Sequence, residues 1–276
     1  MIACYRSAQI ARVIAHRYRH LRLRDEQSPH PRVPVTEREL RTYSAPSFGE
    51  SDGPTFLLLH GIGLSHREFT GLARHLSRVG RVVSFDLPGF GSTPRPRHRL
   101  SVQEHAAIVL RNTARLGLGP VVVVGHSMGA QFAIEIARQR PEAVSRVVLI
   151  GPVVDTRKRT LSAQALVLLR DSSLEPPATQ LMVTADYIRC GLPWFLTEAF
   201  AMRDYPTHLA IREVGHPLLI LRGEHDPIAD ASWCRRLAAQ APDARVATIA
   251  GHRHNVLHSD PAATAAAILD FVRATA

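Results

Sequence analysis

Short, continuous apolar runs recur along most of the chain, starting near residue 54. Runs of this length predict strands buried on both faces of a parallel sheet, because such strands need no polar face. A weakly alternating stretch over residues 37–44 predicts an earlier strand. The firm runs occupy residues 55–59, 81–86, 121–124, 146–150, 217–221 and 245–249.

Stretches with helical spacing of apolar residues separate these runs. They predict helices over residues 65–78 and 101–116, a third after residue 128 and a fourth from residue 261. For the last of these, Asp260 is a typical N-cap and Pro261 a typical first helical residue. Alternation of strands and helices predicts an α/β fold with a mostly parallel, doubly wound sheet flanked by helices.

The alternation stops between residues 155 and 212, where no strand pattern occurs. This segment predicts a helical insertion whose aromatic and sulfur-containing side chains crowd together: Trp194, Phe195, Phe200, Met202 and Tyr205. A chain of 276 residues can hold one large α/β domain with such an insertion, without a second core. We therefore expect an extension and linker over residues 1–35, a core of residues 36–154 and 213–276, and a helical insertion over residues 155–212.

The formal net charge is +10, and Lys158 is the only lysine. Residues 1–32 carry seven arginines against Asp25 and Glu26, which gives 7 − 2 = +5, half of the total excess. No basic stripe interleaved with aromatic residues occurs in the body of the chain, so we expect no nucleic-acid partner.

Residues 10–21 combine arginines with one apolar helical face, formed by Ile10, Val13, Ile14, Tyr18 and Leu21. Arginine recurs too often there for a secretory signal or a membrane span. We favour a helix packed on the body or a loose arm, followed by a linker over residues 27–34. Contact with an anionic membrane and an organelle presequence are the alternatives.

Three cysteines, Cys4, Cys190 and Cys234, are widely spaced and near no pair of histidines. Their number and spacing indicate neither a disulfide framework nor a zinc site. A reducing compartment fits this usage, so we expect a cytoplasmic protein. The sequence does not indicate an oligomeric state.

The segment Gly125-His126-Ser127-Met128-Gly129 follows four consecutive valines and precedes a helical stretch. Glycines two residues before and after the serine lack a Cβ, so a strand and a helix can approach closely around a sharp turn. The serine would then stand at the start of a helix, where free N–H groups and the helix dipole favour negative charge. These features predict that Ser127 is a nucleophile.

This turn resembles the G-x-S-x-G nucleophile elbow of the α/β-hydrolase superfamily, and the resemblance extends from about residue 54 to residue 276. The His60-Gly61-Ile62-Gly63 segment is similar to the family's oxyanion loop. The resemblance implies that the backbone amides of Ile62 and Met128 form the oxyanion hole, with a structural role for His60. Residues 86–92 resemble a family turn in which Asp86 would fix a loop rather than catalyse.

The resemblance also implies an acid and a base. The family places its acid just beyond the strand at residues 217–221, which implies Asp226, with Asp155 as the alternative. Its base commonly ends a G-x-G-H loop, which implies His254. Arg253 stands where the family has its second glycine, so His252 stays open as an alternative base.

The order Ser127, Asp226, His254 matches the superfamily. It implies a serine hydrolase of carboxylic esters or related acyl compounds, working through an acyl-enzyme without a metal or an organic cofactor. A C–C bond hydrolase, an acyltransferase and a cofactor-free perhydrolase are same-fold alternatives, and a non-catalytic binding module is a further one. The insertion would be the family's cap, and its apolar residues predict a small to medium hydrophobic substrate. Those residues are Leu166, Val167, Leu168, Leu169, Trp194, Phe195 and Phe200.

Overall fold

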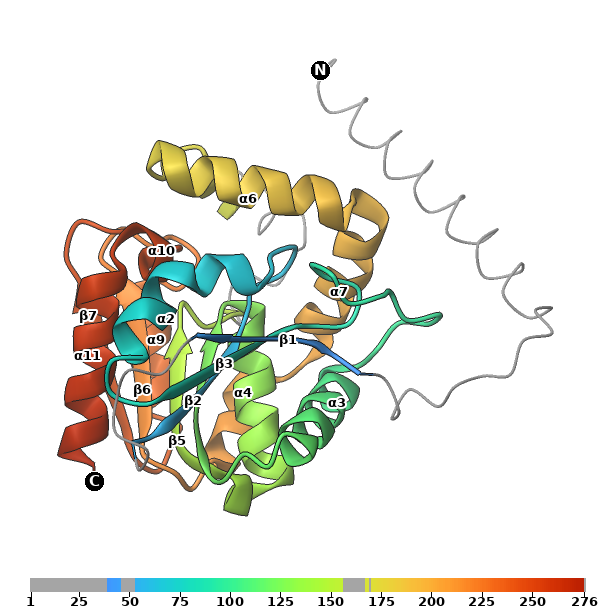
Figure 1. The fold of residues 1–276 in the computed structure, drawn as a ribbon. Helices are drawn as coiled ribbons and strands as arrows, with labels where there is room; N and C mark the ends of the chain where they lie inside the picture. Colours follow the sequence, from blue (N-terminus) through green and yellow to red (C-terminus); the bar gives the residue numbers. More distant parts are fainter. Residues whose placement is uncertain (1–38, 46–52, 156–166, 169, 276) are drawn as a thin grey trace. The chain divides into compact units, whose positions relative to one another are not determined.

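A seven-stranded sheet forms the centre of the computed structural model (Figure 1). The structure describes residues 39–45, 53–155, 167–168 and 170–275, all within one compact unit. The strand order is β1-β3-β2-β4-β5-β6-β7, with β1 antiparallel to β3 and every other neighbouring pair parallel. The strands are β1 (Arg41–Ala45), β2 (Thr55–Leu59), β3 (Arg81–Asp86), β4 (Val121–His126), β5 (Val144–Ile150), β6 (Leu218–Gly223) and β7 (Ala244–Ile249). The predicted fold class is therefore confirmed.

Alternate residues of each central strand enter two separate hydrophobic clusters. On β2, Leu57 and Leu59 pack on one face of the sheet, whereas Phe56 and Leu58 pack on the other. Side chains of a strand alternate between faces, so a strand covered on both sides must be apolar throughout. This is why the central strands appear in the sequence as continuous apolar runs.

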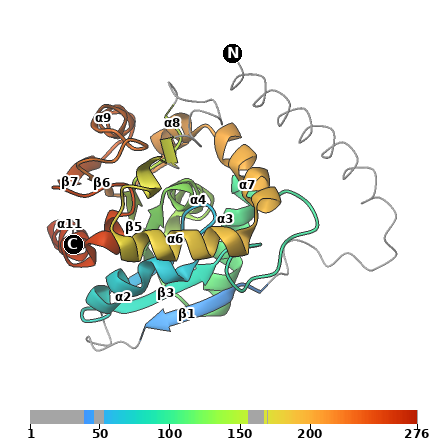
Figure 2. The ribbon, with the colours of Figure 1, turned by 90° about the horizontal axis from the view of Figure 1, so that it is seen from above.

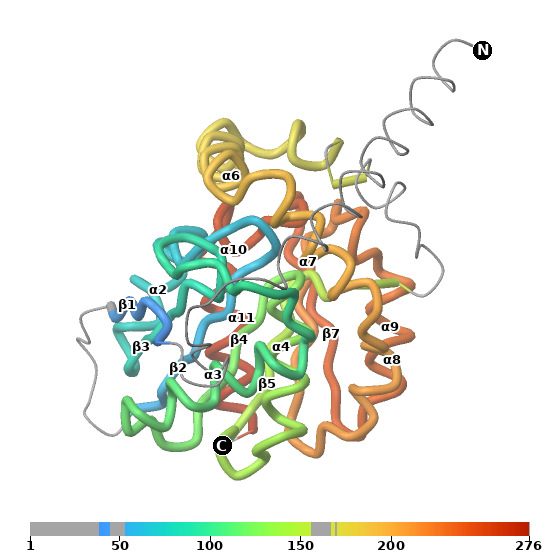
Figure 3. The backbone as a smooth tube through the Cα atoms, turned by 90° about the vertical axis from the view of Figure 1, so that its right-hand side faces the viewer, coloured from blue at the N-terminus to red at the C-terminus, as the bar shows by residue number. Residues whose placement is uncertain are grey.

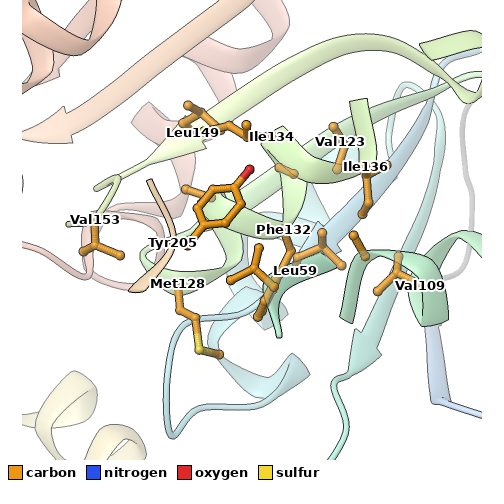
Figure 4. Packing of buried hydrophobic residues seen from close by; sticks show 14 of the residues in the cluster. Leu59, Val109, Val123, Met128, Phe132, Ile134, Ile136, Leu149, Val153 and Tyr205 are labelled. Atoms are coloured by element: carbon orange, nitrogen blue, oxygen red, sulfur yellow. The ribbon is translucent and has the colours of Figure 1, made fainter. Parts of the chain in front are cut away.

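Helices cover both faces of the sheet (Figure 2). One face packs against α2 (Thr70–Leu76), α10 (Val256–Ser259) and α11 (Pro261–Ala274), and the other against α3 (Val102–Arg115), α4 (Met128–Gln139) and α9 (Ala231–Ala238). Figure 4 shows side chains of the second face, among them Phe132 of α4, Val109 of α3, and Leu59 and Val123 of the sheet.

The helix ends follow the capping residues in the sequence. Ser101 and Glu104 form a reciprocal capping box at the start of α3, and Asp260 accepts the Ala263 N–H at 3.0 Å at the start of α11. The predicted stretch over residues 65–78 divides into a 3-10 turn, η3 (His66–Phe69), and α2. Apolar spacing does not predict α9, although Asp230 caps it in the usual way.

The described residues between β5 and β6 form helices and connecting loops, and no strand occurs among them. We call residues 167–213 the helical insert; its main elements are α6 (Pro177–Cys190), α7 (Leu192–Asp204), α8 (Thr207–Ala210) and η5 (Ile211–Glu213). Figures 1 and 3 show α6 lying across one end of the sheet. Met182 and Val183 of α6 pack on Leu64, which follows β2, so α6 faces the carboxyl ends of the parallel strands.

The predicted apolar residues of the insert have different surroundings. Trp194, Met202 and Tyr205 belong to the main hydrophobic cluster, whereas Arg203 lies over the ring of Phe200 at 5.0 Å. Leu166 and Leu169 lie outside the described residues, as do the helix and linker predicted within residues 1–35.

None of the described helices is both long and apolar enough to span a membrane.

Asp86 organises the turn after β3. Its buried carboxylate accepts hydrogen bonds from the backbone N–H groups of His66 and Ser92, at 2.9 and 2.8 Å, and from the hydroxyl of Tyr43 at 3.1 Å. Burial alone would raise the pKa of Asp86, but its contacts with His66 and Ser92 outweigh burial and lower the pKa to about 2. The geometry is that of a residue fixing a loop.

We predict that Asp86→Asn lowers the free energy of unfolding by about 2 kcal/mol at neutral pH. The Asp86 carboxyl is more acidic in the folded chain than in the unfolded one, whose pKa is 3.8, so its stabilisation is present above that value and is lost as the pH falls through about 2. Urea titrations should therefore show the difference between wild type and variant shrinking on acidification. Equal stability at neutral pH would contradict the prediction; Asp243→Asn, at an exposed aspartate, is the matched control.

Candidate active site

Ser127 stands at the tip of the turn between β4 and α4. Its backbone has φ 53° and ψ −114°, and it is the one residue other than glycine with positive φ among those described. Its N–H donates to the carbonyl of Ile150, the last residue of β5, at 2.8 Å. A non-glycine residue in this region is strained, and such strain is concentrated at functional sites.

Two glycines make this turn possible. A Cβ at Gly125 would lie 2.2 Å from the Gly129 carbonyl oxygen, and a Cβ at Gly129 would lie 2.0 Å from the Leu59 carbonyl oxygen. Both neighbours are backbone atoms that cannot move aside. Only glycine therefore permits the close approach of β4 and α4 that the sequence motif predicts, and the contact of α4 with β2.

Asp226 and His254 form a buried pair at the ends of neighbouring strands. Asp226 follows β6, and its Oδ1 accepts the N–H groups of Ile228 and Ala229 at 2.8 and 2.9 Å. His254 Nδ1 lies 2.9 Å from Asp226 Oδ2. His254 Nε2 is buried and has no hydrogen-bond partner among the described residues. With Nδ1–H donating to the carboxylate, Nε2 of the neutral ring is a free proton acceptor.

Gly151 brings this pair next to the end of β5. A Cβ at Gly151 would lie 2.8 Å from His254 Cε1 and 3.3 Å from Asp226 Oδ2. Gly151 directly follows Ile150, to whose carbonyl Ser127 donates its backbone N–H. The carboxyl end of β5 therefore joins the serine turn to the Asp226–His254 pair.

Burial and charge act in opposite directions on this pair. Burial alone would lower the pKa of His254, but the adjacent Asp226 carboxylate, assisted by Asp171 and Glu175, outweighs it and raises that pKa above its ordinary 6.5. Burial likewise would raise the pKa of Asp226, but its contact with His254 and its backbone hydrogen bonds hold that pKa below the ordinary range. The pair is electrostatically suited to hold a proton on His254.

The two alternative residues have other partners. Asp155 pairs with Arg236 Nη2 at 2.9 Å. His252 Nδ1 lies 2.9 Å from the hydroxyl of Ser259, and its Nε2 lies 3.4 Å from the Asp260 carboxylate. The structure thus brings Asp226 together with His254, and it places Asp155 and His252 in contact with other side chains.

The loop after β2 holds Gly61 beside Ser127, with 3.3 Å between a Cβ at Gly61 and Ser127 Cβ. The Gly61 carbonyl accepts from His60 Nδ1 at 2.8 Å and from the Leu64 N–H at 3.2 Å. His60 Nε2 accepts the Leu87 N–H at 3.0 Å, so the ring is neutral, in agreement with burial lowering its pKa. Because a trans peptide directs its N–H opposite to its carbonyl, holding the Gly61 oxygen also fixes the direction of the Ile62 N–H. His60 has the structural role that we expected.

Several polar contacts around the site have no local signature in the sequence. Glu68 and His126 are buried against each other, with 3.0 Å between Glu68 Oε2 and His126 Nδ1. Arg253 pairs with the buried Asp171 of the insert at 2.9 Å, which explains an arginine where the family commonly has glycine. These partners lie 58 and 82 residues apart, so no local pattern connects them.

A family model described as the alpha/beta hydrolase fold matches residues 54–171. A pimeloyl-[acyl-carrier protein] methyl ester esterase of Aromatoleum aromaticum is 30% identical over 256 residues, spanning 80% of this chain and 98% of the esterase. The chain belongs to the α/β-hydrolase fold family and is a hydrolase of that fold.

Two further proteins show the breadth of this family. An (E)-2-((N-methylformamido)methylene)succinate hydrolase of Acinetobacter baylyi is 25% identical over 230 residues, covering 76% of this chain and 86% of that enzyme. The crystal structure of an enol-lactonase from Burkholderia xenovorans superposes with a TM-score of 0.74 at 19% identity, covering 88% of this chain and 100% of the lactonase. The second similarity concerns the fold alone.

We predict that the His254 imidazole titrates above 6.5 and that Asp226→Asn lowers its pKa, because the carboxylate that opposes the effect of burial is then lost. NMR titration of the histidine ring protons measures both values. Asp155→Asn is the matched control and should leave the His254 pKa in place. A shift as large in Asp155→Asn as in Asp226→Asn would contradict the pairing.

Proposed function

We propose that this protein is a serine hydrolase that cleaves carboxylic esters or related acyl compounds through an acyl-enzyme intermediate. One observation carries the proposal: a strained serine turn lies at the same strand ends as a buried Asp226–His254 pair, and His254 Nε2 has no hydrogen-bond partner in the part of the chain that the structure describes. The similarity to a methyl ester esterase supports the choice of substrate class.

In the proposed reaction, Ser127 Oγ attacks the acyl carbon while His254 Nε2 takes the hydroxyl proton. His254 then gives that proton to the leaving alcohol, and water repeats the two steps to release the acid. Asp226 keeps the imidazole in the required tautomer and stabilises the imidazolium. These steps use side chains and backbone amides, without a metal or an organic cofactor.

The proposed oxyanion hole consists of the backbone N–H groups of Ile62 and Met128. Met128 begins α4, where the helix dipole favours an anion. Ile62 follows Gly61, and the Gly61 carbonyl accepts hydrogen bonds from His60 and Leu64 on the side of the peptide opposite to the Ile62 N–H. Donors fixed before the reaction stabilise the tetrahedral oxyanion without reorganisation.

We also propose that residues 155–212 act as a cap over a core of residues 36–154 and 213–276, with residues 1–35 as an extension. A Cβ at Gly63 would lie 2.7 Å from the Tyr187 ring and 3.0 Å from the Phe195 ring. Aromatic side chains of the insert therefore lie against the loop that carries Ile62. This arrangement supports an apolar roof near the acyl group of a small hydrophobic substrate.

We predict that a fluorophosphonate modifies Ser127 and that Ser127→Ala stays unmodified, because the probe needs an activated hydroxyl.

His254→Ala should lower kcat by a factor of roughly 10³ or more, whereas the matched variant His252→Ala should have a much smaller effect. Peptide mass spectrometry and ester kinetics measure these results. Modification at another residue, or the opposite ranking of the histidines, would contradict the assignment.

We predict that kcat/KM for p-nitrophenyl esters peaks at a short or medium acyl chain. Each buried methylene contributes up to about 0.8 kcal/mol until the chain meets the roof. A series of esters of increasing chain length, with a peptide substrate as the negative control, measures this preference. If the protein is modified at Ser127 but cleaves none of the esters, the C–C hydrolase, acyltransferase and perhydrolase alternatives move ahead of the esterase.

A further inference from the structure

Glu68 is a buried acid at the carboxyl ends of the strands. It belongs to η3 and is 0% exposed. Its Oε1 accepts the Gly61 N–H at 3.1 Å, and its Oε2 lies 3.0 Å from His126 Nδ1. A carboxylate in such a place is costly unless several groups hydrogen-bond to it. Gly61 belongs to the loop that carries Ile62, and His126 ends β4 two residues before Met128, so the two partners adjoin the two proposed oxyanion donors.

His126 extends this contact to a third loop. Its Nε2 lies 3.2 Å from the backbone carbonyl of His254, and its ring centroid is 4.9 Å from that of His254. A carbonyl only accepts, so His126 Nε2 carries a proton. The contact between His126 Nδ1 and Glu68 needs one more proton, since an unprotonated ring nitrogen and a carboxylate are both acceptors. The Glu68–His126 pair thus holds two protons and is electrically neutral.

The hydrogen bond from the Gly61 N–H to Glu68 matters most among these contacts, and we call the set of contacts through Glu68 the tether. Glycine has the freest backbone, so the peptides on its two sides are not fixed by the residue itself. Glu68 holds the N–H on one side, and His60 and Leu64 hold the carbonyl on the other. The Ile62 N–H, which shares a peptide with that carbonyl, therefore has a fixed position relative to His126 and Ser127.

We propose that Glu68 is a positioning residue for catalysis, holding the oxyanion loop, the serine turn and the His254 loop in one geometry through Gly61 and His126. The proposal rests on the serine hydrolase function proposed above. Glu68 acts through these residues and takes no part in proton transfer.

Four substitutions separate the reach of the side chain from its charge. Glu68→Gln keeps both contacts, because its oxygen accepts from Gly61 and its amide N–H donates to the unprotonated Nδ1 of a neutral His126. Glu68→Asp keeps the carboxyl group but is one methylene shorter, and Glu68→Ala removes both contacts. Glu198→Ala is the matched control, since Glu198 forms a second buried Glu–His contact, with His105 at 2.9 Å.

The expected result is a kcat lowered about 10-fold or more in Glu68→Ala and Glu68→Asp, with KM within about threefold of wild type, because misplaced oxyanion donors weaken transition-state binding. Glu68→Gln should recover kcat to within about threefold, and Glu198→Ala should lower kcat far less than Glu68→Ala. Active-site titration with the fluorophosphonate corrects each kcat for folded enzyme.

Amide hydrogen exchange gives a readout that needs no substrate. Residues 60–65 should exchange faster in Glu68→Ala than in wild type, and at the wild-type rate in Glu68→Gln and Glu198→Ala. Wild-type protein without hydrolytic activity would refute the proposed function, while exchange would still test the tether. The positioning role would be overturned if Glu68→Ala kept the wild-type kcat. It would also be overturned if kcat fell equally in Glu68→Ala and Glu68→Gln, or equally in Glu68→Ala and Glu198→Ala.

Discussion

The strained backbone at Ser127 is the constraint on which the rest of the site depends. Holding a serine at φ 53° costs of order 1–3 kcal/mol. Interactions of the surrounding structure must therefore stabilise this backbone conformation by more than that cost. Backbone contact of Gly129 with the Leu59 carbonyl and the hydrogen bond from Ser127 to Ile150 supply that support. Both depend on β2, β4 and β5 being buried between two helical layers.

Buried carboxylates perform the corresponding task for the loops around Ser127. Asp86, Glu68 and Asp226 each contact a histidine from another segment, at 2.9 to 3.0 Å. The carboxyl ends of parallel strands lie at the same edge of the sheet. Loops that are far apart in sequence therefore meet there, and many of their backbone groups have no partner within the sheet. Hydrogen-bonded acids satisfy those groups and give each loop one geometry, which apolar packing alone specifies less sharply.

The sequence reveals the parts of this structure that have local signatures. Apolar runs located the central strands, and paired glycines around Ser127 located the sharp turn, because both effects act within a few residues. Asp226 and His254 were identified through resemblance to a family, and the structure brings them together. Glu68 gave no signal, since a lone acid in a polar stretch is ordinarily exposed and its partner His126 is 58 residues away. Helix α9 does carry a signal, in its Asp230 cap and its buried Trp233, Cys234 and Leu237, but its apolar pattern extends over only 8 residues.

The helical insert contacts the same loops that the core uses to build the site. Asp171 pairs with Arg253, and Glu175 accepts the backbone N–H of Asn255 at 2.9 Å, so both neighbours of His254 are held by the insert. Met182 packs on Leu64 beside the oxyanion loop. A change in the insert therefore also changes the support of the His254 and Ile62 loops. Under the proposed function, substrate preference and catalytic geometry would be coupled through those contacts, rather than divided between insert and core.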